Sequence, residues 1–187
     1  MKKSFRSAFL LVILLLAVLV TGCGNNGTGS SDGDSKVHVA KDTFSGKTLI
    51  IYYSYSGTTK RVAEHLQQLT NGELYELTLK EPYTGSSNDV SDRVFAERDD
   101  KKMPELSGKL PDISKYDRIL IGTPVWNDSM SNPVAGYLEQ TDFDGKIVAP
   151  FWTYITNQGS TKKDFENRIK NGNVKAGLPI ASVVYHS

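Results

Sequence analysis

Cysteine is almost absent from this chain of 187 residues, since Cys23 carries its only thiol. A single cysteine excludes an internal disulfide and any site built from several thiolate ligands. The three histidines, His38, His65 and His186, do not have the spacing of a metal site. An excess of charge of one sign is also missing, because 22 Lys and Arg face 21 Asp and Glu. The sequence therefore predicts no metal site and no nucleic-acid partner, which would need a basic surface.

A hydrophobic run long enough to span a membrane is missing as well. The apolar stretch from Ala8 to Val20 is shorter than the roughly 20 residues that a membrane-spanning helix needs. It follows a basic start formed by Lys2, Lys3 and Arg6, and its length is typical of the apolar core of a secretory signal. We interpret residues 1–22 as a signal peptide. Without its three cations the net charge falls from +1 to −2.

Small residues precede the cysteine that ends this run. The segment Val20-Thr21-Gly22-Cys23 resembles the lipobox of bacterial lipoproteins, which implies cleavage before Cys23 and attachment of lipid to its thiol. Two or more lipid chains hold a protein stably on a membrane, because each buried methylene contributes about 0.8 kcal/mol. The resemblance predicts an exported protein, anchored to the outer face of the bacterial cytoplasmic membrane or to a periplasm-facing membrane. An ordinary signal peptide with an incidental cysteine is the alternative.

The chain after Cys23 changes character twice. Residues 24–36 consist mainly of Gly, Asn, Ser and Asp, a composition typical of a flexible tether. We therefore assign residues 23–45 to a lipidated cysteine and its tether. Residues 46–187 have the size of one ordinary domain.

Strand and helix patterns alternate along this domain. Short apolar runs predict strands, and apolar residues three or four apart predict helices. Strands are expected at 48–53, 73–79, 118–122, 146–152 and 180–185, and helices at 59–69, 132–138 and 162–170. Such alternation predicts an α/β fold with a parallel sheet and helices on both of its faces. Ligands of such sheets lie beyond the carboxyl ends of the strands.

The segment from Lys80 to Lys115 is long and polar. We expect a helix over 91–98 and irregular structure over 101–111, where Pro104 and Pro111 lie. The mixed charges at the end of the helix are interpreted as a solvated face. Alternatively, Arg93 or Arg98 could meet a negative substrate.

Hydroxyl side chains follow the first predicted strand. The loop consists of Ser54, Tyr55, Ser56, Gly57, Thr58 and Thr59. Glycine allows a tight turn, and the start of the following helix offers free N–H groups to an anion. The Walker pattern and the dinucleotide Gly-x-Gly-x-x-Gly pattern are both missing. The loop therefore favours the phosphate of a mononucleotide over a simple cluster of helix-capping residues.

Three motifs in order resemble those of the flavodoxin family. The first is the loop above, similar to the Thr/Ser-x-Thr/Ser-Gly-x-Thr phosphate loop. The second is the Tyr-Asp…Gly-x-Pro-x-Trp segment at 116–126, and the third is the Gly-Lys-x-x-x-Pro-Phe strand at 145–151. The resemblance is to the short, often bacterial flavodoxin-like branch. It implies a doubly wound sheet of order 2-1-3-4-5 and FMN as the cofactor.

The resemblance also assigns two loops to the flavin ring. The first comprises Thr123, Pro124, Val125, Trp126 and Asn127, with Trp126 as the stacking ring. The second includes Thr153, Tyr154 and Gly159. This second loop has one glycine where the family has a pair, and no final helix is expected after Val184.

Two functions are compatible with these features. The first is an FMN redox lipoprotein, either an electron carrier for a redox partner or an NAD(P)H-dependent reductase of quinone-like small-molecule acceptors. The second is a non-enzymatic lipoprotein that keeps the fold without FMN and acts as a binding or structural module. The intact phosphate loop favours the first, whereas the crowded second loop and the short end motivate the second.

Overall fold

The computed structural model describes residues 42–182. The predicted signal peptide, Cys23 and most of the predicted tether lie outside these residues, as does the segment after Ser182. No helix within residues 42–182 is long and apolar enough to cross a membrane.

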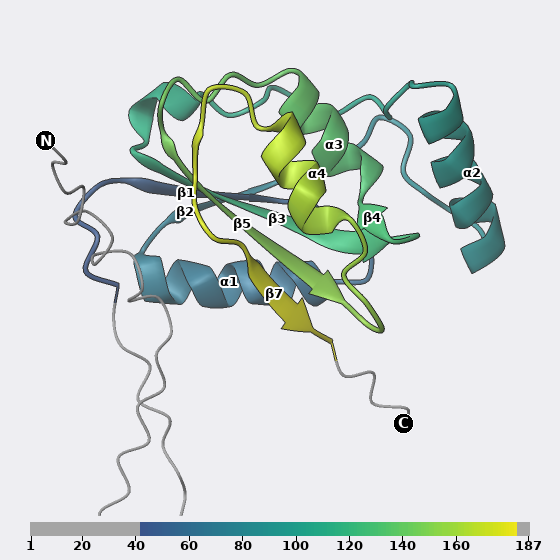
Figure 1. Cartoon of the computed structure of the whole chain (residues 1–187), viewed down its shortest axis with the longest axis horizontal. Coiled ribbons are helices and arrows are strands. Elements are labelled where there is room, and N and C mark those ends of the chain that lie inside the picture. The colour runs from purple at the N-terminus through teal and green to yellow at the C-terminus, as the bar shows by residue number, and fades with distance from the viewer. Residues whose placement is uncertain (1–41, 183–187) are drawn as a thin grey trace, which may run out of the picture. The chain divides into compact units, whose positions relative to one another are not determined.

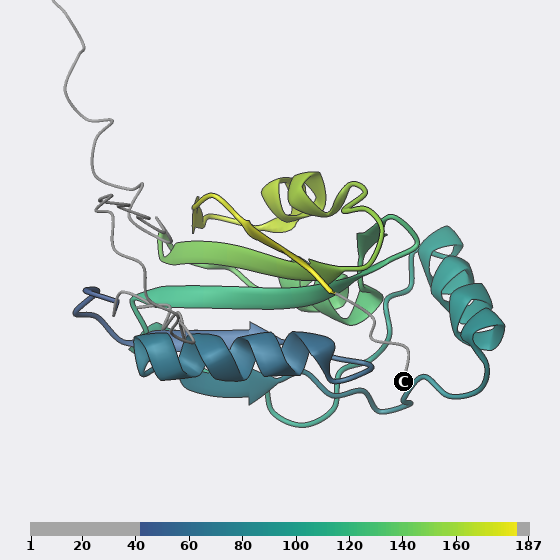
Figure 2. The ribbon, with the colours of Figure 1, turned by 90° about the horizontal axis from the view of Figure 1, so that it is seen from below.

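A parallel sheet forms the centre of the domain (Figures 1 and 2). Its strands lie in the order β2-β1-β3-β5-β6. These strands are β1 (Thr48–Tyr52), β2 (Glu73–Glu76), β3 (Arg118–Trp126), β5 (Ile147–Tyr154) and β6 (Asn173–Val174). The antiparallel β4 (Ser129–Met130) pairs with β3, and β7 (Leu178–Ala181) pairs with β5. The five predicted strands correspond to β1, β2, β3, β5 and β7, so the predicted α/β class and the order 2-1-3-4-5 are confirmed.

Four α-helices accompany the sheet in the described residues. They are α1 (Thr58–Thr70), α2 (Ser87–Asp99), α3 (Asn132–Glu139) and α4 (Thr161–Arg168), and a short 3₁₀ helix, η1 (Ile113–Lys115), precedes β3. The helix α2 starts four residues before its predicted first residue. Its N-terminus is fixed by a capping box, in which the Ser86 hydroxyl accepts a hydrogen bond from the Asp89 N–H, and the Asp89 carboxylate accepts one from the Ser86 N–H.

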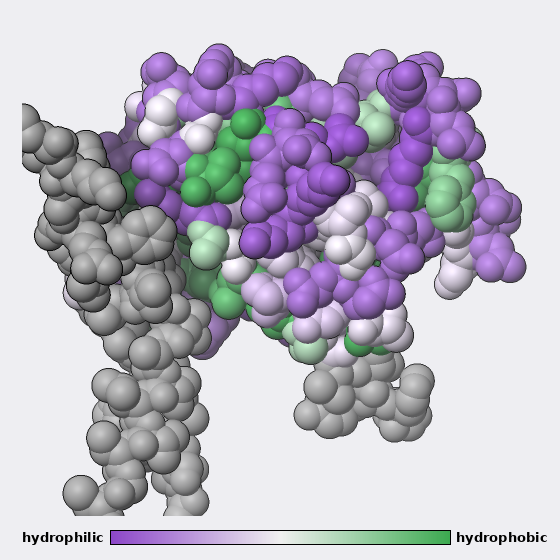
Figure 3. All heavy atoms as spheres, viewed as in Figure 1, coloured by the Kyte–Doolittle hydropathy of each residue, from purple (hydrophilic) through white to green (hydrophobic). Residues whose placement is uncertain are grey.

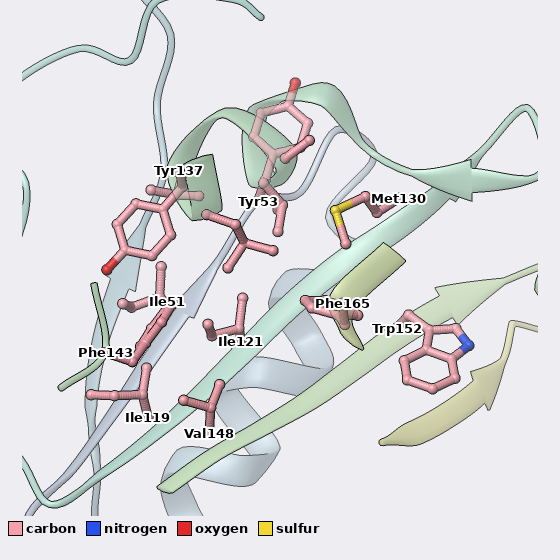
Figure 4. Packing of buried hydrophobic residues seen from close by; sticks show 14 of the residues in the cluster. Ile51, Tyr53, Ile119, Ile121, Met130, Tyr137, Phe143, Val148, Trp152 and Phe165 are labelled. Atoms are coloured by element: carbon pink, nitrogen blue, oxygen red, sulfur yellow. The ribbon is translucent and has the colours of Figure 1, made fainter. Parts of the chain in front are cut away.

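The two faces of the sheet carry cores of unequal size. The larger core lies under α3 and α4, and the neighbouring strands β1, β3 and β5 contribute Ile51, Ile121 and Val148 to it (Figure 4). On the opposite face, α1 is the one helix that covers the sheet within residues 42–182, through Ala63 and Leu66. Leu178 and Ile180 of β7 belong to this smaller core and remain partly exposed.

Pro150 lies inside β5, where a residue without an N–H is unusual. One edge of β5 pairs continuously with β3. The other edge pairs with β6 at residues 147–148 and with β7 at residues 151–154. Pro150 therefore falls in the gap between these two short strands, at a position where that edge of β5 has no strand to bond.

Strand ends differ most from the sequence-based expectation. The third and fourth predicted strands end later than expected, at Trp126 and Tyr154, and the last strand starts earlier and ends at Ala181. The expected residues 183–185 of that last strand lie outside the described residues. The longer β3 is explained by β4, which folds back on it and supplies pairing that a pattern within one strand does not reveal.

Candidate functional site

Three segments meet where β1, β3 and β5 end. The Tyr55 ring after β1 lies 5.9 Å from the Trp126 ring at the end of β3. The hydroxyl of Thr59, at the start of α1, lies 2.8 Å from that of Thr153 in β5. Because these three strands are neighbours and run parallel, their carboxyl ends share one edge of the sheet. The predicted phosphate loop and the two predicted ring loops are therefore brought together.

The loop after β1 offers unpaired donors at the start of α1. Gly57, at the N-cap of α1, has a left-handed backbone, with φ of 84°, and has no side chain to cap the helix. Within the described residues, the N–H groups of Thr58 and Thr59 have no acceptor. A side chain at Gly57 would meet nothing closer than the Arg61 guanidinium at 3.8 Å, so the space above this glycine is open. Free N–H groups and the positive end of a helix favour an anion here.

The hydroxyls of the loop have different surroundings. Ser54 accepts a hydrogen bond from the Lys60 N–H, and the hydroxyls of Ser56 and Thr58 lie 3.2 Å apart on the exposed side. Thr59 is fully buried, and its hydroxyl is paired with Thr153. Three hydroxyls thus remain on the open side of the loop, while Thr59 ties the loop to β5.

Arg61 was missed by the sequence reasoning. Its guanidinium donates a hydrogen bond of 3.3 Å to the Thr58 hydroxyl and so lies over the loop. The neighbouring Lys60 instead pairs with Glu76 at 3.3 Å. The available signal was spacing, because residues three apart on a helix lie on the same side.

Trp126 is the centre of an aromatic cluster. The rings of Tyr53, Tyr55 and Tyr83 approach it at 5.6, 5.9 and 5.0 Å between centroids, each nearly perpendicular to it. Tyr53 and Tyr83 are buried, whereas Tyr55 is 48% exposed and Trp126 is partly exposed. Trp126 therefore packs against two buried tyrosine rings and one exposed ring, and is itself partly exposed.

Tyr83 comes from the long polar segment and was not predicted. Its phenol donates a hydrogen bond of 2.5 Å to Glu97, and the Arg93 guanidinium lies 4.2 Å above its ring. Arg93 also binds Glu97 at 2.8 Å. Burial, followed by the hydrogen bond to Glu97, raises the pKa of Tyr83 well above its ordinary value. The prediction of a solvated helix face is wrong for Arg93 and Glu97, because they hold this tyrosine against Trp126.

Arg98 joins α2 to the turn that follows β3. Its Nη2 donates hydrogen bonds of 3.1 Å to the carbonyls of both Trp126 and Met130. Its Nε donates to the Asn132 side chain at 2.9 Å. Arg98 is therefore not part of a solvated face either, because its guanidinium is hydrogen-bonded to the carbonyls of Trp126 and Met130.

The two predicted ring loops contact each other. Asn127 and Asp128 both have positive φ, 45° and 58°, as required by a two-residue hairpin turn between β3 and β4. The Asp128 carbonyl accepts a hydrogen bond of 2.7 Å from the Ser160 N–H. Gly159 lies so close that a Cβ there would be 1.9 Å from the Asp128 oxygen. Gly159 therefore serves the contact between the loops.

The remaining predicted residues lie on strands. Thr123, Pro124 and Val125 belong to β3, and the hydroxyl of Thr123 lies 2.9 Å from that of the buried Ser131. Thr153 and Tyr154 belong to β5, and Tyr154 packs against the larger core. These residues form the strand ends on which the site is built. The exposed part of the site consists of residues 54–58, Trp126 and the turn from Asn127 onward.

Comparison with known proteins places these features in context. Residues 47–184 match a family model described as flavodoxin. A flavoprotein of Lactobacillus acidophilus NCFM, solved in complex with FMN, is 30% identical with a TM-score of 0.66, covering 72% of this chain and 93% of that one. A candidate flavoprotein of Bacteroides uniformis ATCC 8492 is 33% identical with a TM-score of 0.63, covering 73% and 92%. A protein of Paraburkholderia phymatum named NAD(P)H dehydrogenase (quinone) is 24% identical over 144 residues, 71% of each chain.

Proposed function

Because this chain belongs to the flavodoxin family, we propose that it binds FMN where β1, β3 and β5 end. It would use this cofactor for electron transfer, with a quinone-like molecule as the acceptor. The observation that carries the proposal is the contact between the phosphate loop and the Trp126 cluster, seen in the 5.9 Å separation of the Tyr55 and Trp126 rings. Similarity to the FMN-bound flavoprotein and to the quinone dehydrogenase supports it.

The residues present fit the phosphate of FMN. The unpaired N–H groups of Thr58 and Thr59, the exposed hydroxyl of Ser56 and the guanidinium of Arg61 are all donors at one loop. The open space above Gly57 lets a ligand approach the backbone. No Asp or Glu occurs between Ser54 and Thr59. A phosphate would therefore meet donors and one positive charge without a carboxylate that opposes it.

The residues also fit an aromatic ring beside the phosphate. Trp126 and Tyr55 present partly exposed aromatic surface, against which a planar ring can stack. Burial is the main reason that the pKa of Tyr53 rises to about 12. Burial raises the pKa of Tyr83 as well. Both phenols are therefore neutral near pH 7 and add no charge beside Trp126. Bound FMN would supply the ability to accept and release electrons, while these residues bind and orient it.

The visible spectrum of the purified full chain tests this function. We expect a yellow protein, or a colourless one that becomes yellow with added FMN. NADPH or NADH, added without oxygen, is then expected to bleach it, and a soluble quinone is expected to restore the colour. Bleaching by dithionite but by neither nucleotide would indicate an electron carrier and contradict an NAD(P)H-dependent reductase. A colourless protein that takes up no FMN would contradict the proposal and favour a binding module without flavin.

The proposal also includes a lipid anchor on Cys23, which rests on the resemblance of Val20-Thr21-Gly22-Cys23 to a lipobox. Cells fed labelled palmitate are expected to label the wild-type chain and not Cys23→Ser, because the thiol is the site of attachment. Equal labelling of both chains, measured after purification, would contradict the anchor. The result is independent of FMN binding.

A further inference from the structure

A cavity lies between α2, β4, α3 and the end of α4. Its volume is about 420 Å³, within the range of small-molecule sites. Ser129 and Met130 of β4 line it together with three cations, Arg98, Lys101 and Arg168. Figure 3 shows hydrophilic surface over α2 and α4, the helices that carry Arg98 and Arg168.

Arg98 is a half-buried cation whose direct partners are all neutral. Its hydrogen bonds go to the Asn132 amide oxygen and to the backbone carbonyls of Trp126, Asn127 and Met130. The bond from Nη1 to Asn127 is long, at 3.4 Å, and the second N–H of Nη1 has no acceptor in the described part of the chain. A charge removed from water is normally paired with an opposite charge, whereas no carboxylate of residues 42–182 is hydrogen-bonded to Arg98.

The charges around Arg98 act in both directions. Burial is the main influence and lowers the pKa of Arg98, whereas Asp164 and Glu97 raise it and Arg168 lowers it. The Asp164 carboxylate accepts hydrogen bonds from Ser129 and from the Met130 N–H, so these groups share its charge.

Glu139 is the one carboxylate among the residues that line the cavity, and it is already paired. Glu139 pairs with Arg168, and its backbone carbonyl accepts a hydrogen bond from Lys170. Lys101 is exposed and follows α2 with a left-handed backbone, φ 52°. Three cations and one carboxylate therefore line the cavity, which is an excess of two positive charges.

We propose that this cavity binds a small dianion, carried by a phosphate or by a dicarboxylate, between Arg98, Lys101 and Arg168. The unused N–H of Arg98 and the charge of Lys101 would meet the ligand directly. The guanidinium of Arg168, which now pairs with Glu139, would turn to pair with the ligand. Charge-assisted hydrogen bonds of this kind are stronger than those Arg98 makes to neutral carbonyls.

Calorimetric titration of the full chain with inorganic phosphate, and separately with succinate, tests the proposal. The titration is done with Ser56→Asp, because the FMN phosphate loop is then closed to anions and the two sites are distinguished. Lys101→Gln is expected to weaken binding about three- to fivefold, the effect of one exposed charge. Arg168→Gln is expected to weaken it at least as much. Lys102→Gln is the matched control, since this neighbouring lysine is not part of the cavity lining and its loss should change affinity less than twofold.

The outcomes separate the possibilities. Binding of phosphate alone assigns a phosphorylated ligand, and binding of succinate alone assigns a dicarboxylate. Binding of neither anion overturns the proposal, as does an equal effect of Lys101→Gln and Lys102→Gln. Anion binding by the wild-type chain that disappears in Ser56→Asp would also overturn it, since the anion would then occupy the phosphate loop. A wild-type chain that takes up no FMN but still binds the anion would refute the proposed FMN function and leave the anion site standing.

Discussion

Ser56→Asp is expected to abolish FMN binding, with a dissociation constant at least about 100-fold higher than that of the wild type. Two charges 4 Å apart interact by about 4 kcal/mol near a protein surface, and about 1.4 kcal/mol corresponds to tenfold in affinity. The Ser56 hydroxyl lies 3.2 Å from that of Thr58 on the exposed side of the loop. A carboxylate there would face the phosphate and would also compete for the N–H groups at the start of α1. Fluorescence titration with FMN measures the change.

Two further variants make this prediction specific. Ser56→Ala removes one hydroxyl without adding charge and is expected to weaken binding by tenfold at most. Ser45→Asp adds the same charge on an exposed residue just before β1, at the opposite edge of the sheet, and should leave affinity unchanged. Unchanged affinity in Ser56→Asp would show that the phosphate binds elsewhere.

Gly159→Ala is expected to separate the two ring loops and to destabilise the domain more than an ordinary glycine substitution. A Cβ at Gly159 would lie 1.9 Å from the Asp128 carbonyl oxygen, so one of the two backbones must move. The left-handed φ of 52° adds about 1–2 kcal/mol for a residue with a side chain. We expect the free energy of unfolding to fall by about 3 kcal/mol or more, since crowding a packed contact costs about 1–3 kcal/mol beyond strain.

Gly108 provides a matched control for this substitution. It has a left-handed φ of 74°, and a Cβ there would have nothing within 4 Å. Gly108→Ala therefore reports the backbone strain alone, about 1–2 kcal/mol. Urea denaturation of both variants measures the difference. Equal losses of stability in the two variants would refute the role of Gly159 in joining the loops.

Much of the fold was predictable because its signals are local. The apolar runs of β1 and β3, the helical spacing of Ala63 and Leu66, and the glycine and hydroxyls before α1 each lie within a few residues of one another. The strand order itself came from the resemblance and is confirmed. Short segments such as β4 and β6 were missed because each consists of two residues and exists only through its partner strand.

The candidate site was predictable only in part, for a related reason. The sequence indicated the phosphate loop, which directly follows β1, and Trp126, which ends β3. Tyr83 and Arg98 come from a polar segment without periodicity, and their roles depend on contacts with residues far away in the chain. Arg61 could have been found from its spacing to Thr58. The mixed charges of α2 were misinterpreted because a solvated face and a set of ion pairs have the same composition.

The hydrogen bond between Thr59 and Thr153 joins residues 94 positions apart. Closing so long a loop is entropically costly, and contacts of this kind are slow to form during folding. The phosphate loop and β5 are therefore expected to meet later in folding than the local contacts of α1 with β1. A ligand that binds only the finished site stabilises the native state by mass action. Bound FMN is thus expected to hold this long-range contact closed and to lower the fraction of the chain that is open to proteases.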